Sequence, residues 1–107
     1  MFTRLVELRA KFGKARELSN VLNEKVVPIL QNQPGFVDEI VLVSATEPDR
    51  VLGLSFWHAE ADAERYNREH FKRVSDILSP LIEGAPKVQT FNVDTALSHG
   101  IAKGKAA

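Results

Sequence analysis

The 107-residue sequence has no cysteine, no glycine-rich loop and no long apolar run. Without cysteine, the chain forms no disulfide, has no thiolate nucleophile and offers no cysteine ligand to zinc or to an iron–sulfur cluster. Its glycines are scattered, so neither a nucleotide-binding loop nor the Gly-x-Ser-x-Gly turn of hydrolases is present. Charged residues interrupt the segment 1–13, unlike the apolar core of a signal peptide. We therefore expect a soluble, cytoplasmic protein that does not contact a membrane.

The sequence also has no excess of positive or of negative charge. The chain carries 14 Lys and Arg residues and 14 Asp and Glu residues, so its formal net charge at pH 7 is 0. Proteins that bind nucleic acids need a basic surface to neutralise phosphates, and no basic stripe is present here. We expect no nucleic-acid partner. With 44% hydrophobic residues, a chain of this length suits one globular domain with a modest core.

The periodicity of apolar residues predicts the order βαββαβ. Polarity alternates over 2–11, and apolar residues recur every three or four positions from Gly13 to Gln33. Pro28 lies inside this helical segment and lacks a backbone N–H, so we expect a kink there. Further strands are predicted over 36–45, 51–57 and 87–94. The second helix is predicted over 59–84, and Pro80 should tighten its last turn. The sequence thus predicts an α+β, ferredoxin-like domain with an antiparallel sheet over 1–94, followed by a C-terminal tail over 95–107.

The two strands of the predicted hairpin are apolar on both faces. Successive strand residues point to opposite faces, so the apolar runs 40–43 and 51–57 predict a sheet that is covered on both sides. Helices in right-handed crossovers lie on one side of a sheet and cover only one face. We expect a second copy of the chain to cover the other face, sheet against sheet, in a homodimer. The alternative, an exposed apolar surface of this size, is uncommon on monomers.

The third predicted strand has only bulky residues on one face, and two small residues beside a tryptophan on the other. The bulky residues are Leu52, Leu54 and Phe56, and the alternate positions hold Gly53, Ser55 and Trp57. We expect the bulky face to meet the dimer partner. The Trp57 face should then look toward the helices, where Gly53 leaves space for a ligand pocket of about 300 Å3 or more. The competing interpretation is that Trp57 only fills the core.

One of the three histidines is a candidate for proton transfer. His70 is the best general-base candidate, since imidazole titrates near neutral pH and this residue borders the apolar stripe of the second helix. The alternative is a structural histidine at a helix boundary. His58 lies on the strand face opposite to Trp57, and His99 falls in the tail, so neither is assigned a role. The sequence has no His-x3-His pair or zincin motif, so we expect no metal.

Several short motifs resemble the antibiotic biosynthesis monooxygenase (ABM) superfamily. They are Gln33-Pro34-Gly35-Phe36, Asp49-Arg50, Phe56-Trp57, His70-Phe71 and Ser79-Pro80-Leu81. The resemblance covers roughly residues 1–94. It implies a dimeric α/β barrel of two ferredoxin-like subunits. For some members, it also implies oxidation of phenols or quinols by O2 without a cofactor, in a pocket between sheet and helices.

The resemblance also assigns residues to the pocket. Trp57 matches the strand-end tryptophan of the family, His70 and Phe71 match its His-Phe pair, and Tyr66 falls where relatives have an aromatic residue or a histidine. Quinone-forming members have an asparagine where this chain has Gly53. In haem-degrading relatives, an Asn, a Trp and a His ligand are required, and the corresponding residues here are Val6, Tyr66 and Ser75 or Asp76. Haem degradation is therefore not expected.

The resulting expectation is a cofactor-free monooxygenase that acts on a small aromatic substrate. His70 would remove a phenolic proton, while Trp57, Tyr66 and Phe71 hold the ring and exclude water. Two alternatives stay open. One is a non-catalytic module that binds a small molecule, since fold does not determine function. The other is an isomerase or decarboxylase of the muconolactone type, which uses the same cavity without O2.

Overall fold

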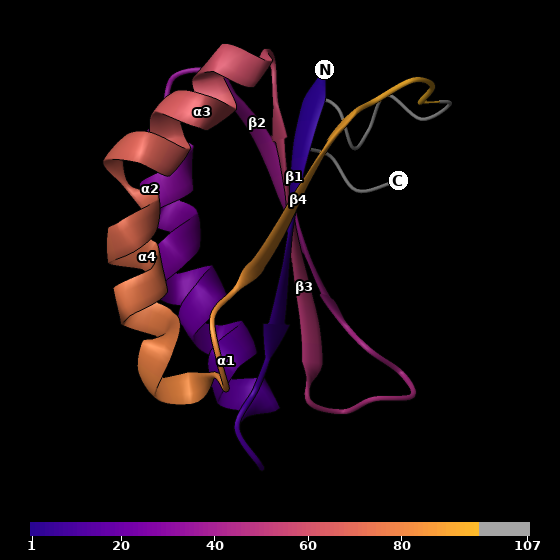
Figure 1. Ribbon diagram of the computed structural model, residues 1–107, viewed down its shortest axis with the longest axis vertical. Helices are drawn as coiled ribbons and strands as arrows, with labels where there is room; N and C mark the ends of the chain where they lie inside the picture. The colour runs from indigo at the N-terminus through magenta and orange to yellow at the C-terminus, as the bar shows by residue number, and fades with distance from the viewer. Residues whose placement is uncertain (97–107) are drawn as a thin grey trace.

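The computed structural model describes residues 1–96 as one antiparallel sheet with helices on a single side (Figure 1). Its elements, in chain order, are β1 (Phe2–Arg9), α1 (Ala15–Val21), the π-helical turn η1 (Leu22–Val26), α2 (Val27–Gln31), β2 (Phe36–Val43), β3 (Arg50–Trp57), α3 (Glu60–Glu69), α4 (Phe71–Leu78), the 3-10 turn η2 (Ser79–Leu81) and β4 (Lys87–Asn92). The strand order is β2-β3-β1-β4, and every neighbouring pair is antiparallel. This arrangement confirms the predicted ferredoxin-like βαββαβ fold. Most of the predicted tail, residues 97–107 with His99, lies outside the described residues.

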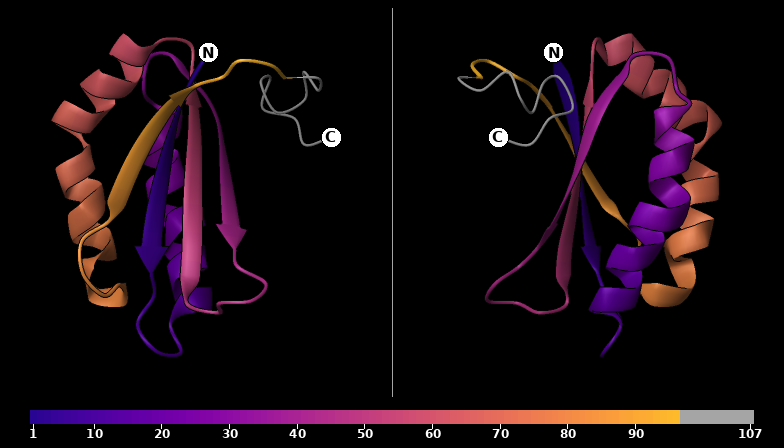
Figure 2. Two further views of the ribbon diagram at one scale, coloured as in Figure 1. Left: turned by 45° about the vertical axis from the view of Figure 1, so that its right-hand side comes forward. Right: turned by 180° about the vertical axis from the view of Figure 1, so that it is seen from behind.

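The sheet has an inner face, which the helices cover, and an outer face, which they leave open (Figure 2). On β3 the inner residues are buried and the outer ones are partly exposed, which confirms the face assignment predicted for this strand. The inner face and the helices enclose the hydrophobic core. Its largest fully buried side chains are Trp57, Leu8, Leu18, Leu78 and Val51.

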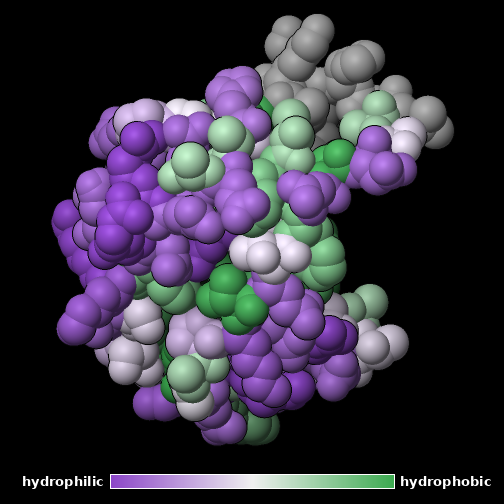
Figure 3. Space-filling view, turned by 45° about the horizontal axis from the view of Figure 1, so that its top comes forward, coloured by the Kyte–Doolittle hydropathy of each residue, from purple (hydrophilic) through white to green (hydrophobic). Residues whose placement is uncertain are grey.

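Apolar residues gather on the outer face of the sheet. We call them the outer apolar face: Leu5, Ile40, Leu42, Leu52, Leu54, Phe56 and Phe91. Of these, Leu42 is 46% exposed and Phe91 is 49% exposed. In the space-filling view, hydrophilic residues gather over the helical side at left, and hydrophobic residues lie toward the sheet at right (Figure 3). No helix of residues 1–96 covers this apolar surface.

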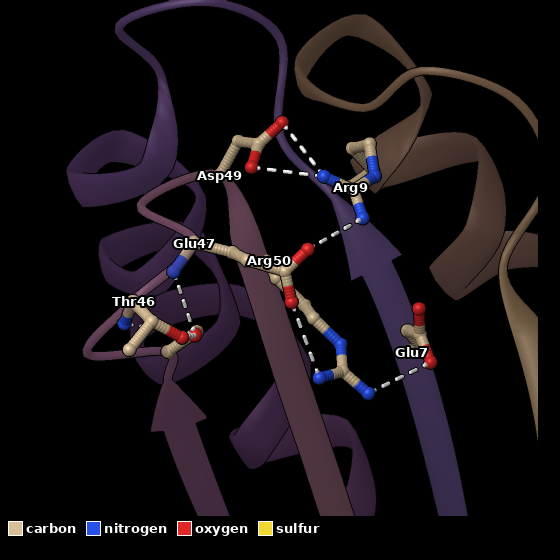
Figure 4. A network of polar contacts seen from close by, with 7 residues as sticks. Glu7, Arg9, Thr46, Glu47, Asp49 and Arg50 are labelled. Carbon is tan, nitrogen blue, oxygen red and sulfur yellow. Dashed lines mark hydrogen bonds and ion pairs between the residues drawn. The ribbon is translucent and has the colours of Figure 1, made fainter.

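A network of ion pairs borders the outer apolar face near the β2–β3 hairpin (Figure 4). Arg9 pairs with Asp49, with 2.9 Å between Nη1 and Oδ1, and with Glu47 at 3.7 Å. Arg50 pairs with Glu7 and with Glu47, both at 3.4 Å. Because Arg9 and Arg50 are direct partners across β1 and β3, the acidic residues offset the repulsion between two like charges. The side chains are partly exposed, so we expect the network to orient the hairpin and to add little stability.

Each of the two helical segments that connect the strands is interrupted. The first passes from α1 to α2 through the π turn η1, which ends two residues before Pro28, where the sequence predicts a kink. The second is not the continuous helix predicted over 59–84, because His70 has φ −130° and ψ −21° and separates α3 from α4. Pro80 lies in the predicted tight turn, η2. Within residues 1–96, each helix is too short or too polar to cross a membrane.

Gly35, which lies just before β2, should tolerate substitution poorly. Its φ of +80° is in the left-handed region, and a Cβ atom would collide with the side chain of Asp62 in α3. Asp62 also pairs with Arg65 at 2.7 Å. We expect Gly35→Ala to lower the free energy of unfolding by about 2–3 kcal/mol, the sum of backbone strain and displacement of Asp62.

Gly13 provides the matched control for this substitution. Its φ is +73°, and no atom lies within 4 Å of a Cβ built there. Gly13→Ala should therefore lower the free energy of unfolding through backbone strain alone, by about 1–2 kcal/mol. Urea denaturation of both variants measures the difference, and equal losses would show that Asp62 does not restrict position 35.

Candidate functional site

A small cavity lies between the inner face of the sheet and the helices. Its volume is about 30 Å3. This is room for one or two water molecules, whereas pockets for small molecules have about 300–1,000 Å3. The helical side contributes Leu22 and Val26 of η1 together with Tyr66, Phe71 and Val74, and the sheet contributes polar groups. The cavity lies where the sequence predicts a pocket, but it is far smaller than expected.

The polar groups of the sheet form a single row. Ser55 of β3 pairs with Arg4 of β1 on one side and with Glu39 of β2 on the other, so all three point to the inner face. Gly53 lies in the next row, and its missing side chain leaves the space between the strands and the helices. The site therefore has a sheet floor, where the three polar residues lie beside Val6 and Leu8, under an apolar and aromatic helical cover.

A β-bulge directs Glu39 to the inner face. The register of β2 against β3 shifts between Phe36 and Asp38, because Val37 is an extra residue. Without this bulge, the alternation that begins at Phe36 would point Glu39 outward. With it, Glu39 is partly buried and lines the cavity.

Arg4 brings a positive charge into the core. Its side chain is only 3% exposed overall, and its Cζ lies 4.6 Å from the ring centroid of Phe71 and 5.3 Å from that of Tyr66. Its Nη2 donates a hydrogen bond to Oδ1 of Asn67 at 2.9 Å. Burial lowers the pKa of Arg4, and the neighbouring Tyr66 and Glu39 oppose this shift. A guanidinium nonetheless stays charged at neutral pH, so Arg4 is a buried cation held by two aromatic faces.

The carboxyl group of Glu39 is largely buried, and its pKa lies close to neutral pH. Its Oε1 lies 3.0 Å from the position that a Cβ of Gly53 would occupy, so the absent side chain makes room for the carboxyl group. Burial raises the pKa of Glu39 to about 8, the charge of Asp38 adds to the rise, and Arg4 opposes it. Glu39 is therefore mainly protonated at pH 7 and can exchange a proton near physiological pH.

This carboxyl predicts a pH dependence of stability. The folded chain keeps the proton of Glu39 up to about pH 8, whereas an ordinary glutamate in the unfolded chain loses it near its model value of 4.5. Between these values the folded state binds more protons, so the free energy of unfolding should fall as the pH rises. Glu39→Gln should flatten this fall and should be more stable than the wild type above pH 8. Urea denaturation at several pH values measures both, and parallel curves would mean that the carboxyl is not buried.

Tyr66 connects the cavity to an aromatic row. Its ring lies 5.3 Å from Trp57, 6.3 Å from Phe71 and 6.4 Å from His70, measured between centroids. Burial raises the pKa of Tyr66 to about 12, and Arg4 opposes the rise. Tyr66 is therefore a neutral phenol at physiological pH. It lines the cavity together with Phe71 and Gly53, as the sequence predicts for a binding site.

Trp57 lies beside the cavity and does not line it. Its side chain has no exposed surface, and its ring packs edge-on against Phe36 at 5.6 Å. Its Nε1 donates a hydrogen bond to Oγ of Ser55 at 2.9 Å. The small residue in front of the indole thus provides a hydrogen-bond acceptor, which is the packing expected of a core residue.

His70 also lies outside the cavity lining. Its N–H donates to the carbonyl of Tyr66 at 2.8 Å, and its carbonyl accepts from Val74 at 3.2 Å. Its ring is stacked on Tyr66, so that Tyr66 is the contact between His70 and the site. His58 is exposed beyond the end of β3. Within residues 1–96, no three His, Asp or Glu side chains are placed to hold a metal ion.

The sequence reasoning missed both charged residues of the site. A signal for Arg4 exists, because it shares a strand parity with Phe2, Val6 and Leu8, which are apolar and suit the core. A charge on a buried face is uncommon unless it is paired or functional. Glu39 gives no such signal, since its direction depends on the bulge.

The sequence profile of the family described as antibiotic biosynthesis monooxygenase (ABM) matches residues 1–76. The chain belongs to this family. No curated protein matches the chain at a significant level. Among solved ABM-like structures, the monooxygenase ActVA-Orf6 of Streptomyces coelicolor, in complex with Nanaomycin D, is 18% identical with a TM-score of 0.77, over 91% of this chain and 90% of its own. SnoaB, a cofactor-independent oxygenase from Streptomyces nogalater, is 18% identical with a TM-score of 0.76, over 90% and 95%. At this identity the similarity establishes a shared fold.

Proposed function

We propose that this ABM-family chain is a cofactor-independent monooxygenase whose substrate is a small aromatic molecule with an acidic hydroxyl, such as a phenol or a quinol. The observation that carries the proposal is the cavity, where Tyr66 and Phe71 lie beside the buried cation Arg4. Aromatic rings suit a flat ligand, and a cation in a dry site stabilises an oxygen anion. The family and the printed descriptions of SnoaB and ActVA-Orf6 support the same reaction class.

Substrate entry requires the cavity, with its volume of about 30 Å3, to widen. The helical cover is interrupted at two places beside the cavity, at the π turn η1 and at His70 between α3 and α4. Interrupted helical hydrogen bonding makes these places easier to deform than a regular helix. We propose that the two helical segments move apart there, so that Trp57, Tyr66 and Phe71 contact the substrate ring above Gly53.

The proposed reaction takes all its electrons from the substrate. A base removes the hydroxyl proton, and the electron-rich anion reacts with O2. The ring C–H opposite the hydroxyl becomes C=O with one oxygen atom of O2, and the hydroxyl oxygen becomes a second C=O. The hydroxyl proton and the ring hydrogen leave with the other oxygen atom of O2 as water. The base predicted from the sequence is His70, and this role requires its ring to reach the cavity when the α3–α4 junction opens.

Oxygen consumption tests this proposal. Purified protein treated with a chelator is screened with hydroquinones, naphthols and anthrones in an oxygen electrode. We expect saturable uptake of one O2 per product. If a compound binds without oxygen uptake, the chain is a binding module; if it is converted without O2, the chain is an isomerase or a decarboxylase. Either result would reject the monooxygenase.

We also propose that the chain is a homodimer that packs through the outer apolar face. This surface lies on the side of the sheet away from the helices, and its apolar residues lie mainly on β2 and β3, with one each on β1 and β4. Burying it against a second copy removes apolar area from water. The ion pairs of Figure 4 would then form a polar rim beside an apolar centre, as is usual at protein interfaces.

A further inference from the structure

We propose that Arg4 and Glu39 form a proton-accepting anion site in this cavity: Glu39 takes the proton of a weakly acidic hydroxyl, and Arg4 binds the oxygen anion that remains. The inference deepens the proposed function, because the ligand is the same aromatic alcohol. It assigns proton removal to the sheet floor and not to His70.

The position of the two residues supports the assignment. Arg4 and Glu39 are separated by one strand, so their backbones lie about 10 Å apart across Ser55. Both side chains line the same cavity. The ion pairs found among residues 1–96 do not include one between them. A hydroxyl placed between the two side chains can therefore contact both.

The charge balance of the site favours an anion. Arg4 is a buried cation in a narrow, largely apolar space, and its side-chain hydrogen bond among the described residues goes to a neutral amide, Asn67. The high pKa of Glu39, about 8, leaves most of this carboxyl uncharged at pH 7. A buried cation without a charged partner is unfavourable, and an arriving anion relieves this.

The surroundings of Glu39 leave few other groups to control its proton. Asp38 precedes it on β2, Arg4 faces it from β1 and Tyr66 faces it from α3. The helical residues that line the same cavity from η1, α2 and α4 are apolar. Tyr66, with a pKa of about 12, stays protonated in the working range. Glu39 is thus the group of the cavity that changes charge near neutral pH.

The proton transfer is balanced without a co-reactant. The reacting form of Glu39 is its ionised fraction, about one tenth at pH 7 for a pKa of about 8. The hydroxyl O–H bond of the ligand breaks, the proton joins this carboxylate, and the electron pair stays on the ligand oxygen beside Arg4. A ligand that is already anionic, such as a benzoate, would need Arg4 and not Glu39. This difference separates an acidic hydroxyl from a permanent anion as the natural ligand class.

The test uses 4-nitrophenol, which absorbs at the blue end of the visible range only as the phenolate. The wild type is titrated without oxygen at several pH values, and binding is followed through the fluorescence of Trp57, the one tryptophan of the chain. We expect bound probe to ionise at a pH lower than free probe. Above pH 8, where Glu39 is mainly ionised, binding of the phenolate should raise the pKa of Glu39 and take up close to one proton per bound probe in weakly buffered solution, whereas Glu39→Gln should bind the probe without this uptake. Arg4→Lys should keep part of the effect.

Two matched variants complete the design. Glu7→Gln removes a carboxylate from the other face of the sheet and should behave as the wild type. His70→Ala tests the other candidate base. The proposal is overturned if Glu39→Gln takes up protons on binding as the wild type does, if only His70→Ala loses the uptake, or if the wild type does not bind at millimolar concentration. Because oxygen is absent, a failure of the monooxygenase reaction leaves this result unaffected.

Discussion

Trp57→Ala should lower the free energy of unfolding by about 3–5 kcal/mol, the range for removing a large aromatic side chain from a core. The indole has no exposed surface and contacts both Phe36 and Tyr66. Its loss leaves a large void and removes the hydrogen bond to Ser55. Denaturation followed by circular dichroism measures the effect, since the variant contains no tryptophan.

Trp57→Phe is the control for this substitution. A phenyl ring keeps much of the packing but loses the Nε1–H donor, so we expect a loss of about 1–2 kcal/mol. A loss below about 1 kcal/mol for Trp57→Ala would mean that the site relaxes easily. Trp57 would then belong to a deformable pocket and not to the rigid core.

Leu54→Asp should convert the proposed homodimer into a monomer. Leu54 lies on the central strand β3 within the outer apolar face, so a dimer that uses this face would bury the introduced carboxylate without a partner. We expect the dissociation constant to rise by a factor of about 100 or more. Light scattering coupled to size-exclusion chromatography measures the mass at several concentrations.

Asn20→Asp adds the same charge at an exposed position of α1 and should leave the dimer intact. Circular dichroism should show both variants folded, because neither residue lies in the core cluster. A wild type that is monomeric at about 100 μM would contradict the dimer directly. A Leu54→Asp variant with the mass of a dimer would place the interface elsewhere.

The order of the elements and the two faces of the sheet could be predicted from local pattern. The alternation of small and bulky residues in β3 assigns Gly53, Ser55 and Trp57 to the helical side, and burial confirms it. The break at His70 could not be predicted, since the apolar period continues through it. A change of backbone dihedral angles at one residue does not alter the spacing of apolar residues along the sequence.

The candidate site could be predicted only in part. Tyr66, Phe71 and Gly53 line the cavity, whereas Trp57 and His70 do not line it and contact residues that do, such as Tyr66. Arg4 and Glu39 complete the site from two strands that are distant in sequence. Their meeting depends on strand order and on one extra residue in β2, which are properties of the folded sheet and not of a local pattern.

Opening of the small cavity to an aromatic alcohol can be observed by NMR spectroscopy. The wild type, labelled at its Leu and Val methyl groups and its aromatic rings, is titrated with 1-naphthol in the absence of oxygen. We expect saturable shifts at Leu22, Val26, Tyr66 and Phe71, which line the cavity on the helical side. Shifts confined to the outer apolar face, or none up to the solubility of the ligand, would show that the cavity is only part of the core.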